Sequence, residues 1–172
     1  MRWSMIRKRD VANGPGIRVS IYVQGCSHHC PGCFNPETWD FNGGKIFNRH
    51  ILTQFLEFAQ PKEIAGFSIL GGEPLQQDSD MLMMVKAMKE QFPSKTIWMW
   101  TGYTWEELSD EQREVVSVID VLVDGHFDES KKIPSLRFRG STNQRIIDVQ
   151  ATLANNSIVL HPLMGRYCNE HV

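Results

Sequence analysis

Short β-like runs alternate with helical stretches along most of this chain, and this alternation restricts the fold more than any other feature. Apolar runs rich in β-branched residues lie at 17–23, 64–70, 96–100 and 119–123. Helical periodicity begins near residues 48, 78 and 104. Asn48 is a candidate N-cap, Met81, Met84 and Met88 share one apolar stripe, and Thr104-x-x-Glu107 and Ser109-x-x-Gln112 are candidate capping boxes. Strands and helices in this order predict a parallel sheet joined by crossover helices. A closed eight-unit barrel needs about 250 residues, and the chain has 172. We therefore expect an α/β fold, an open partial (β/α) barrel of about five to six βα units.

The chain contains no repeat, low-complexity tract or linker that would divide it. We therefore expect one domain spanning residues 1–172. Beyond residue 140 the periodicity weakens, and the remaining strand candidates are residues 145–149 and 157–161.

The charge balance and the lack of long apolar runs exclude several classes of protein. Lysine and arginine number 18 against 20 aspartates and glutamates, a net charge of −2, whereas a general nucleic-acid binder needs a cationic face. No apolar run approaches the roughly 18 residues of a membrane span. The basic N-terminus is followed by no apolar signal core. We expect a soluble, cytoplasmic protein with no nucleic-acid partner and no membrane partner.

Three of the four cysteines lie within eight residues, at Cys26, Cys30 and Cys33. A secreted disulfide scaffold would carry more cysteines and spread them along the chain, so this clustering favours metal or redox chemistry. A [4Fe–4S] cluster ordinarily takes four thiolates, and three would leave one iron open to an exogenous ligand. The alternative is a structural zinc site completed by His28 or His29. The spacing alone leaves both open.

The cysteine cluster and three other motifs each follow a predicted strand. These motifs are Gly-Gly-Glu-Pro at 71–74, Thr-Gly-Tyr at 101–103 and Asp-Gly at 124–125. In parallel sheets, chemistry gathers at the carboxyl ends of the strands, which share one edge. We therefore expect these four segments, distant in sequence, to meet at one rim.

Further motifs stand in order around the cysteines. They are Asn-Gly-Pro-Gly-Ile-Arg at 13–18, Cys-x3-Cys-x2-Cys-Phe-Asn at 26–35, Trp-Thr-Gly-Tyr at 100–103, Leu-Val-Asp-Gly-His-Phe at 122–127 and Phe-Arg-Gly-Ser-Thr-Asn-Gln-Arg at 138–145. With these motifs, residues 13–149 of the chain resemble the radical S-adenosylmethionine (SAM) enzymes. Within that superfamily the chain is similar to the glycyl-radical activases that serve anaerobic ribonucleoside-triphosphate reductases.

The resemblance implies that Cys26, Cys30 and Cys33 hold a [4Fe–4S] cluster whose open iron chelates the amino and carboxylate groups of SAM. One electron from the reduced cluster would cleave a carbon–sulfur bond, giving methionine and a 5′-deoxyadenosyl radical. In this family the radical takes a hydrogen atom from a glycine of the partner reductase, so the resemblance implies a radical SAM oxidoreductase. Cluster potentials span about −700 to +450 mV, and this reaction needs the low end. A flavodoxin-like electron donor is therefore expected.

Six further residues are candidates for cofactor binding: Gly72, Glu73, Arg18, Phe34, Thr101 and Asp124. A glycine lets the backbone approach a ligand, and the Glu73 carboxylate can accept a hydrogen bond from the SAM ammonium. The arginine can pair with a carboxylate near the site, and Phe34 can pack near the cluster or the adenine. The threonine and the aspartate, at strand ends, can hydrogen-bond the adenosyl part. For each residue, an ordinary turn, capping, salt-bridge or core role is the alternative.

Three other functions are compatible with parts of the sequence. Two belong to the same class: activation of a different glycyl radical enzyme, and radical SAM chemistry on a small molecule. The third is a zinc-stabilised interaction module, which would leave the motifs at the strand ends without a common purpose. The fourth cysteine, Cys168, has no role in the resemblance, and we expect it to be a bystander.

Overall fold

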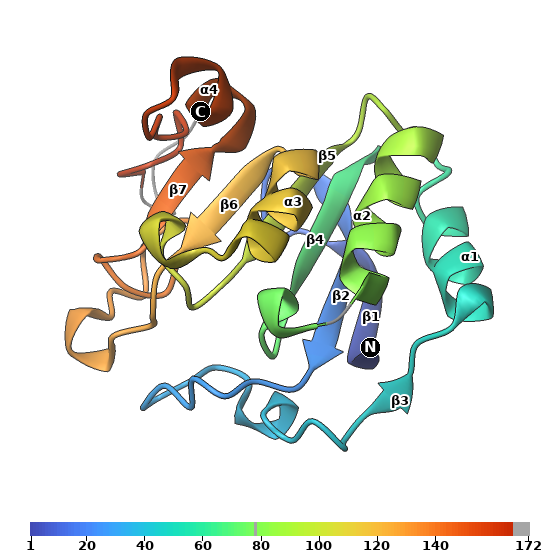
Figure 1. The fold of residues 1–172 in the computed structure, drawn as a ribbon, viewed down its shortest axis with the longest axis horizontal. Coiled ribbons are helices and arrows are strands. Elements are labelled where there is room, and N and C mark those ends of the chain that lie inside the picture. The colour runs from blue at the N-terminus through green and yellow to red at the C-terminus, as the bar shows by residue number, and fades with distance from the viewer. Residues whose placement is uncertain (78, 167–172) are drawn as a thin grey trace.

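The computed structural model describes residues 1–77 and 79–166, which form a seven-stranded sheet in the order β3-β1-β2-β4-β5-β6-β7 (Figure 1). The strands are β1 (Arg2–Asp10), β2 (Ile17–Gln24), β3 (Lys45–Ile46), β4 (Ile64–Gly71), β5 (Thr96–Trp100), β6 (Val121–Asp124) and β7 (Arg145–Asp148). Strands β2, β4, β5 and β6 run parallel to one another, whereas β1, β3 and β7 pair antiparallel with their neighbours. The carboxyl ends of the four parallel strands therefore form one edge of the sheet.

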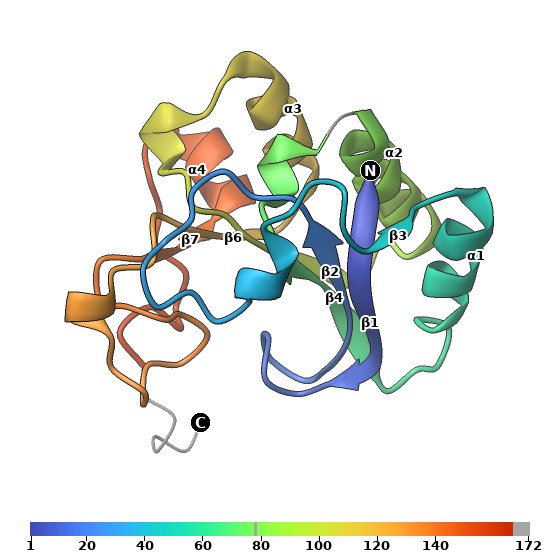
Figure 2. The same cartoon turned by 90° about the horizontal axis from the view of Figure 1, so that it is seen from below.

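The helices lie on one face of this sheet, as the two views in Figures 1 and 2 show. The α-helices are α1 (Arg49–Glu57), α2 (Ser79–Gln91), α3 (Asp110–Val118) and α4 (Val149–Asn155). Short 3-10 helices are η1 (Pro36–Thr38), η2 (Pro74–Gln76), η3 (Trp105–Glu107) and η4 (Glu129–Lys131). None of the described helices could bridge the apolar interior of a bilayer.

Local sequence signals explain where the helices begin. Asn48 caps α1 by accepting a 3.0 Å hydrogen bond from the backbone N–H of Ile51. Ser109 opens α3 with a capping box, in which its hydroxyl and the side chain of Gln112 each bond the other residue's backbone N–H. The predicted apolar stripe of α2 is buried, including Met81 and Met88. The predicted helices are therefore confirmed, although the capping box at Thr104 opens only the 3-10 helix η3.

Successive side chains along each strand point to opposite faces of the sheet, and this separates two apolar clusters, one on each face. Val19 and Ile21 belong to the main core, which packs under the helices. On the opposite face, Trp98, Val123 and Ile146 form a smaller cluster. Phe138 and the segment around residues 161–164 pack over that smaller cluster. Both faces of the central strands are therefore covered, as the near-continuous apolar strands require.

The open sheet agrees with the predicted open α/β architecture, but it differs from the predicted partial barrel in two ways. The structure has four parallel strands and three crossover helices, α1 to α3, so five to six βα units are too many. The basic segment Arg2–Asp10 forms β1, a strand that the sequence did not predict. Only six residues, 11–16, join β1 to β2. A link this short cannot make a parallel crossover, so these two strands pair antiparallel.

Two weaker strand predictions fall at the end of the described chain. Residues 145–149 were a strand candidate, and the structure confirms β7 at Arg145–Asp148. Residues 157–161 make only an isolated bridge, Ile147 with Leu160, rather than a strand. Cys168 lies outside the described residues.

Candidate functional site

The three clustered cysteines lie on a loop, residues 25–39, that follows β2 at the carboxyl edge of the parallel strands (Figure 2). Two backbone hydrogen bonds close the base of this loop. The N–H of Gly25 donates to the carbonyl of Thr38 at 2.8 Å, and the N–H of Cys26 donates to the carbonyl of Trp39 at 3.0 Å. The loop, here called the cysteine loop, is therefore anchored at both ends while its middle lies outside the sheet.

The backbone of the cysteine loop is bonded directly to the loop that follows β4. The N–H of Glu73 donates a 2.8 Å hydrogen bond to the carbonyl of Gly25. A Cβ atom on Gly72 would lie 2.4 Å from that same carbonyl oxygen, so this close approach requires glycine at position 72. The predicted pairing of the cysteine and Gly-Gly-Glu-Pro motifs is therefore a backbone contact.

The three thiols are free and differ in exposure. Cys26 is buried, whereas Cys30 and Cys33 are half-buried. Burial raises the pKa of the Cys26 and Cys30 thiols. The Sγ atom of Cys30 lies 3.5 Å from Nδ1 of His126, and the Sγ atom of Cys33 accepts a 3.4 Å hydrogen bond from the N–H of Asn35. The thiols therefore have protein neighbours but no disulfide partner among the described residues.

A hollow of about 470 Å³ lies beside the buried cysteine. The cysteine loop contributes one wall with Cys26, Ser27 and His29, and the stretch 39–42, including the exposed Phe41, contributes the other. The ring centroids of His29, on the first wall, and Trp39, on the second, are 4.7 Å apart. The hollow therefore opens the cysteine loop to solvent beside Cys26.

The Glu73 carboxylate is the hydrogen-bonding centre of the rim. It is 1% exposed. Its Oε1 accepts from the N–H of Leu75 at 2.9 Å and from the hydroxyl of Thr101 at 2.7 Å. Its Oε2 accepts from the N–H of Gly102 at 2.7 Å. A buried carboxylate with this many donors is held in one orientation, and it joins the loops that follow β4 and β5.

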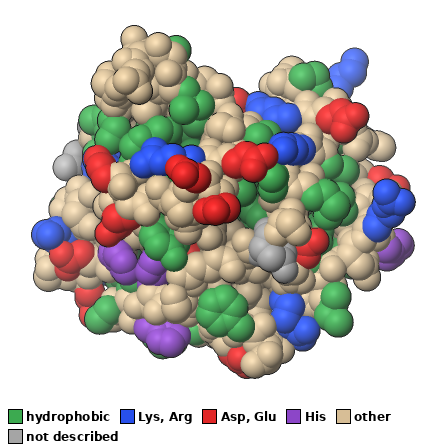
Figure 3. Space-filling view, in the orientation of Figure 1, with side chains coloured by type: hydrophobic (Ala, Val, Ile, Leu, Met, Phe, Trp, Pro, Cys, Tyr) green, Lys and Arg blue, Asp and Glu red, His purple; other side chains and the backbone are tan. Residues whose placement is uncertain are grey.

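His28 fills the space beside this carboxylate. Its Nε2 lies 3.2 Å from Oε2 of Glu73 and is buried without a hydrogen bond among the described residues. The His28 ring packs edge-on against Tyr103 at 4.7 Å and against His126 at 4.4 Å. Figure 3 shows histidine side chains gathered at the lower left of the molecule, where Figure 1 has the loops after β2 and β6. Neither His28 nor His126 was predicted to join the rim in this way.

Asp124, at the end of β6, holds the rim together from the other side. Its oxygens accept from the N–H of Trp105 at 2.8 Å and from the Arg145 guanidinium at 3.0 and 2.5 Å. The same guanidinium pairs with Glu106, and that pairing lowers the pKa of Glu106 to about 2. Asp124 is 1% exposed, and both of its carboxylate oxygens already accept hydrogen bonds from the protein.

The four predicted segments do meet at one rim. In addition to the contacts above, the N–H of Gly125 donates to the carbonyl of Tyr103 at 2.8 Å, which joins the loops after β5 and β6. Gln76 was missed by the sequence analysis. Its side chain bonds Ser27 and the hydroxyl of Tyr103, thereby linking the loops after β2, β4 and β5. The sequence signal that could have indicated Gln76 is its position, two residues after Pro74 of the Gly-Gly-Glu-Pro motif.

Arg18 is not part of this rim. It lies at the amino end of β2 in register with Gly66, at the edge of the sheet opposite the cysteine loop. Its guanidinium is fully buried and donates to Ser68 Oγ at 2.8 Å and to the carbonyls of Phe67 and Thr96 at 2.6 and 2.8 Å. Burial lowers the pKa of Arg18 to about 10. Arg18 therefore joins the amino ends of β2, β4 and β5.

Phe34 projects from the cysteine loop and is 60% exposed. Its ring centroid lies 5.0 Å from that of Phe127, and the Nζ atom of Lys132 lies 4.9 Å from the ring centroid. Phe34 is therefore near the rim but is not packed into a core.

The donor chemistry of the loop fits an iron–sulfur cluster. Three free thiols on one loop are the ligand type that such clusters take. Within residues 1–77 and 79–166, no three cysteine, histidine, aspartate or glutamate side chains converge as metal ligands. The middle of the cysteine loop must therefore readjust for its three thiols to reach one cluster.

Comparison with known proteins agrees with the site. A family described as a 4Fe-4S single cluster domain matches residues 12–147. An anaerobic ribonucleoside-triphosphate reductase-activating protein of Escherichia coli strain K12 is 44% identical over 139 residues, covering 78% of this chain and 90% of that protein. The protein of the same name from phage T4 is 36% identical over 149 residues, covering 85% of this chain and 93% of its own. The chain belongs to the anaerobic ribonucleoside-triphosphate reductase-activating proteins.

This membership confirms the family that the motifs predicted. The family-matched region, residues 12–147, contains the cysteine loop, the Glu73 loop and the loops after β5 and β6. It leaves out β1, which pairs with the outer side of β2.

Proposed function

We propose that this chain activates an anaerobic ribonucleoside-triphosphate reductase by cleaving SAM reductively and generating a glycyl radical on the reductase. The observation that carries the proposal is the hydrogen bond from the N–H of Glu73 to the carbonyl of Gly25, which joins the cysteine loop to the Glu73 loop. The names of the relatives support the reductase as the partner. The match to a 4Fe-4S domain supports an iron–sulfur cofactor.

In this proposal Cys26, Cys30 and Cys33 bind one [4Fe–4S] cluster. Three thiolates leave one iron without a protein ligand, and SAM would occupy that position. The chemistry that the cluster supplies when reduced is the single electron that cleaves a carbon–sulfur bond of SAM. The chain holds its three thiols on one loop whose base is fixed at Gly25 and Cys26, and it keeps Cys26 buried away from water.

Glu73 is proposed to receive the ammonium group of SAM. Donors from the loops after β4 and β5 already orient its carboxylate, so little reorganisation is needed when a cation arrives. His28 must move aside for this contact, because its Nε2 lies 3.2 Å from Oε2 of Glu73. Gly72 leaves the approach to the cluster free of side-chain atoms and allows the two loops to touch.

Thr101 and Asp124 are proposed to act as positioning residues. Thr101 holds Oε1 of Glu73, and Asp124 holds the start of η3 through the N–H of Trp105. Phe34 stays a proposed contact of the cofactor, since its exposed ring projects from the cysteine loop next to Cys33. We propose no cofactor contact for Arg18, which serves the amino edge of the sheet.

The electron donor and the compartment follow from the same chemistry. Cleavage of SAM needs a cluster at the low end of the range of about −700 to +450 mV, so we propose a flavodoxin-like donor. Three neighbouring free thiols persist in a reducing compartment, whereas an oxidising compartment would convert them to disulfides. We therefore propose that the protein works in the cytoplasm.

The first test is spectroscopic. The chain is reconstituted anaerobically with iron and sulfide, reduced with dithionite and examined by electron paramagnetic resonance with and without SAM. We expect a [4Fe–4S] signal that changes when SAM is added. Zinc bound in place of iron, or a cluster signal indifferent to SAM, would overturn the proposal and favour the interaction module.

The second test uses single substitutions and the reductase. Replacing Cys26, Cys30 or Cys33 with alanine should abolish the formation of 5′-deoxyadenosine, whereas the matched control Cys168→Ala should retain it. Mixing the wild-type protein with reductase and SAM should give a glycyl radical signal by electron paramagnetic resonance. Intact SAM cleavage without that signal would redirect the proposal to a different glycyl radical enzyme or to a small-molecule substrate.

A further inference from the structure

Strand β1 leaves most of its outer edge unpaired. It pairs with β2 along its length, but on its other side β3 pairs only with Arg2 and Trp3. No other strand of the described residues lies beyond β1 on that side, because β3 is the end of the sheet. The outward backbone N–H and C=O groups from Ser4 to Arg9 are therefore available to another strand. An edge of this kind accepts an extended segment by β-strand addition.

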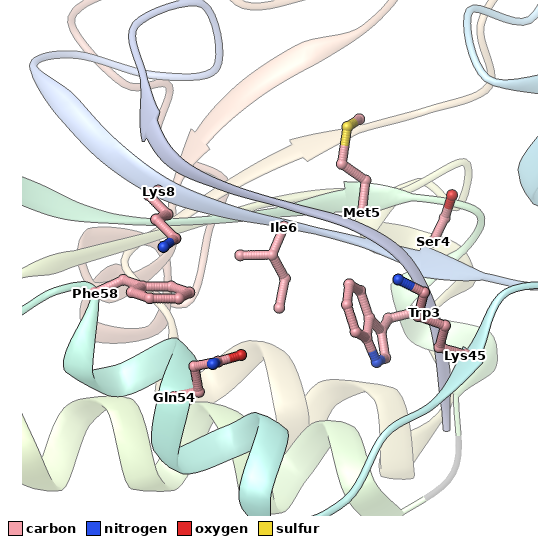
Figure 4. Close-up of a pocket in the computed structure, with 8 residues that line it drawn as sticks. All are labelled: Trp3, Ser4, Met5, Ile6, Lys8, Lys45, Gln54 and Phe58. Atoms are coloured by element: carbon pink, nitrogen blue, oxygen red, sulfur yellow. The ribbon is translucent and has the colours of Figure 1, made fainter.

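A hollow of about 370 Å³ lies along this edge, between β1 and α1 (Figure 4). In Figure 4 the side chains of Trp3, Ile6 and Phe58 point into the space between the strand and the helix, whereas Met5 and Ser4 point to the other side of the strand. The indole Nε1 of Trp3 is buried and has no acceptor among the described residues. Beneath an added strand, the side chains of Trp3, Ile6 and Phe58 would therefore leave an apolar space for one of its side chains.

The charges around this hollow have one sign. The Nζ atom of Lys45 lies 5.0 Å from the centroid of the Trp3 ring, and that of Lys8 lies 4.3 Å from the centroid of the Phe58 ring. No carboxylate lines the hollow, and neither lysine has an ion-pair partner among the described side chains. The complementary ligand is an extended segment that carries carboxylates on both sides of an apolar residue.

A second copy of this chain does not fit the same edge. Strand β1 carries Arg2, Arg7, Lys8 and Arg9 against the single carboxylate of Asp10. Two such strands side by side would bring like charges together at the contact, which is destabilising. The charge pattern therefore favours an acidic partner over self-association.

The edge is continuous with the proposed active site. Trp3 pairs with Val23, three residues before Cys26, so this end of β1 lies next to the start of the cysteine loop. The stretch 40–42 lines the hollow beside Cys26, and Lys45, three residues later, lines the hollow beside β1. A polypeptide bound along β1 can therefore continue past residues 40–45 toward the cysteine loop. The protein that must reach that loop is the substrate of the reaction.

We propose that the outer edge of β1 and the hollow beneath it bind an extended acidic segment of the reductase as an added β-strand. The identity of the partner rests on the proposed function. One apolar side chain of the segment fills the space lined by Trp3, Ile6 and Phe58, and its flanking carboxylates pair with Lys8 and Lys45. This contact anchors the reductase beside the cysteine loop without using any residue of the cofactor site.

Charge reversal at the two lysines tests the surface. The cluster-loaded protein with Lys8→Glu and Lys45→Glu should bind the reductase about tenfold or more weakly by calorimetry, because like charges would then face the acidic segment. The matched control, Arg49→Glu with Lys62→Glu, changes two exposed basic residues outside the hollow and should bind as the wild type does. Dithionite-driven SAM cleavage without the reductase should be unchanged in both, which shows that the variants fold.

Amide hydrogen exchange tests whether the contact is an added strand. Binding of the reductase to the wild-type protein should slow exchange at the outward N–H groups of residues 4–9. An unchanged affinity of the lysine variant, equal weakening in the control variant, or unslowed exchange in β1 would each overturn the proposal. A wild-type protein that binds the reductase through β1 but forms no glycyl radical on it would instead overturn the proposed function and leave the docking surface standing.

Discussion

The hydroxyl of Thr101 donates a 2.7 Å hydrogen bond to Oε1 of Glu73, and this bond joins the ends of two parallel strands, β4 and β5. The same hydroxyl oxygen accepts from the N–H of Tyr103 at 3.2 Å, so the loop after β5 is held by its own threonine. Because Gly102 also donates to the carboxylate, the orientation of Glu73 is set by the protein before any ligand arrives. The proposed SAM site is thus built from loop-to-loop bonds.

Substitution of Thr101 tests this arrangement. Thr101→Val keeps the shape but removes the donor to Glu73, and leaving a buried carboxylate oxygen short of a partner costs about 1–3 kcal/mol of unfolding free energy. We expect SAM to bind more weakly as well, because the carboxylate is less firmly oriented. Urea unfolding and a SAM titration measure the two effects. Thr101→Ser, which keeps the hydroxyl, should restore both, and a valine variant equal to wild type in both would contradict the positioning role.

The two rim glycines should respond differently to an added methyl group. A Cβ on Gly72 would meet the backbone of Gly25 at 2.4 Å, whereas a Cβ on Gly102 would meet the side chain of His28 at 2.6 Å. The Gly25 backbone cannot shift without moving the cysteine loop, whereas the His28 side chain can rotate away. Gly72→Ala should therefore lower the iron and sulfide bound on reconstitution, while Gly102→Ala should retain the cluster and displace His28 from Glu73. Equal cluster content in the two variants would refute this distinction.

The parts of the fold that the sequence predicted correctly are those set by local signals. The cap at Asn48 and the methionine stripe of α2 depend on residues within one or two turns of helix, and both are present. Strand β1 was missed because bulges interrupt its register between Trp3 and Met5 and again between Arg7 and Asp10. A strand with two bulges and a basic half does not show a clean period of two.

For the site, topology was predictable and individual contacts were not. The rule that chemistry gathers at the carboxyl ends of parallel strands predicted that Glu73 and Thr101 would lie near each other. The same rule argues against Arg18, which stands one residue after the start of β2, at its amino end. The packing of His28 beside Glu73 and His126 depends on how three loops fold back on one another. No local pattern in the sequence encodes that arrangement.

Arg18 should matter for stability and not for the cofactor. Its buried guanidinium satisfies the carbonyls of Phe67 and Thr96 and the hydroxyl of Ser68. Arg18→Met should lower the unfolding free energy by roughly 3 kcal/mol, since several buried acceptors lose charge-assisted bonds. The affinity of the folded, cluster-loaded variant for SAM should stay at the wild-type value. Arg49→Met, on the exposed start of α1, is the control, and a specific loss of SAM binding in Arg18→Met would return that residue to the site.

His161 should make stability depend on pH near neutrality. Burial lowers the pKa of His161 from 6.5, and its Nδ1 accepts a 3.2 Å hydrogen bond from the N–H of Leu163, which requires the neutral ring. The ring also packs edge-on against Trp98 at 5.2 Å. Because the folded pKa lies below the unfolded value, the unfolded chain binds more protons as the pH falls. The contribution is therefore present above pH 6.5 and lost below it.

Urea unfolding of the reduced protein between about pH 7.5 and pH 5.5 measures this loss, whose slope for one proton is at most about 1.4 kcal/mol per pH unit. His161→Gln removes the titrating group and should flatten the pH dependence. His50→Gln, on the exposed surface of α1, should leave the dependence as steep as in the wild type. If the His161 variant keeps the full wild-type dependence of unfolding free energy on pH, groups other than His161 cause that dependence. In that case the packing of residues 161–164 against Trp98 does not depend on a neutral histidine.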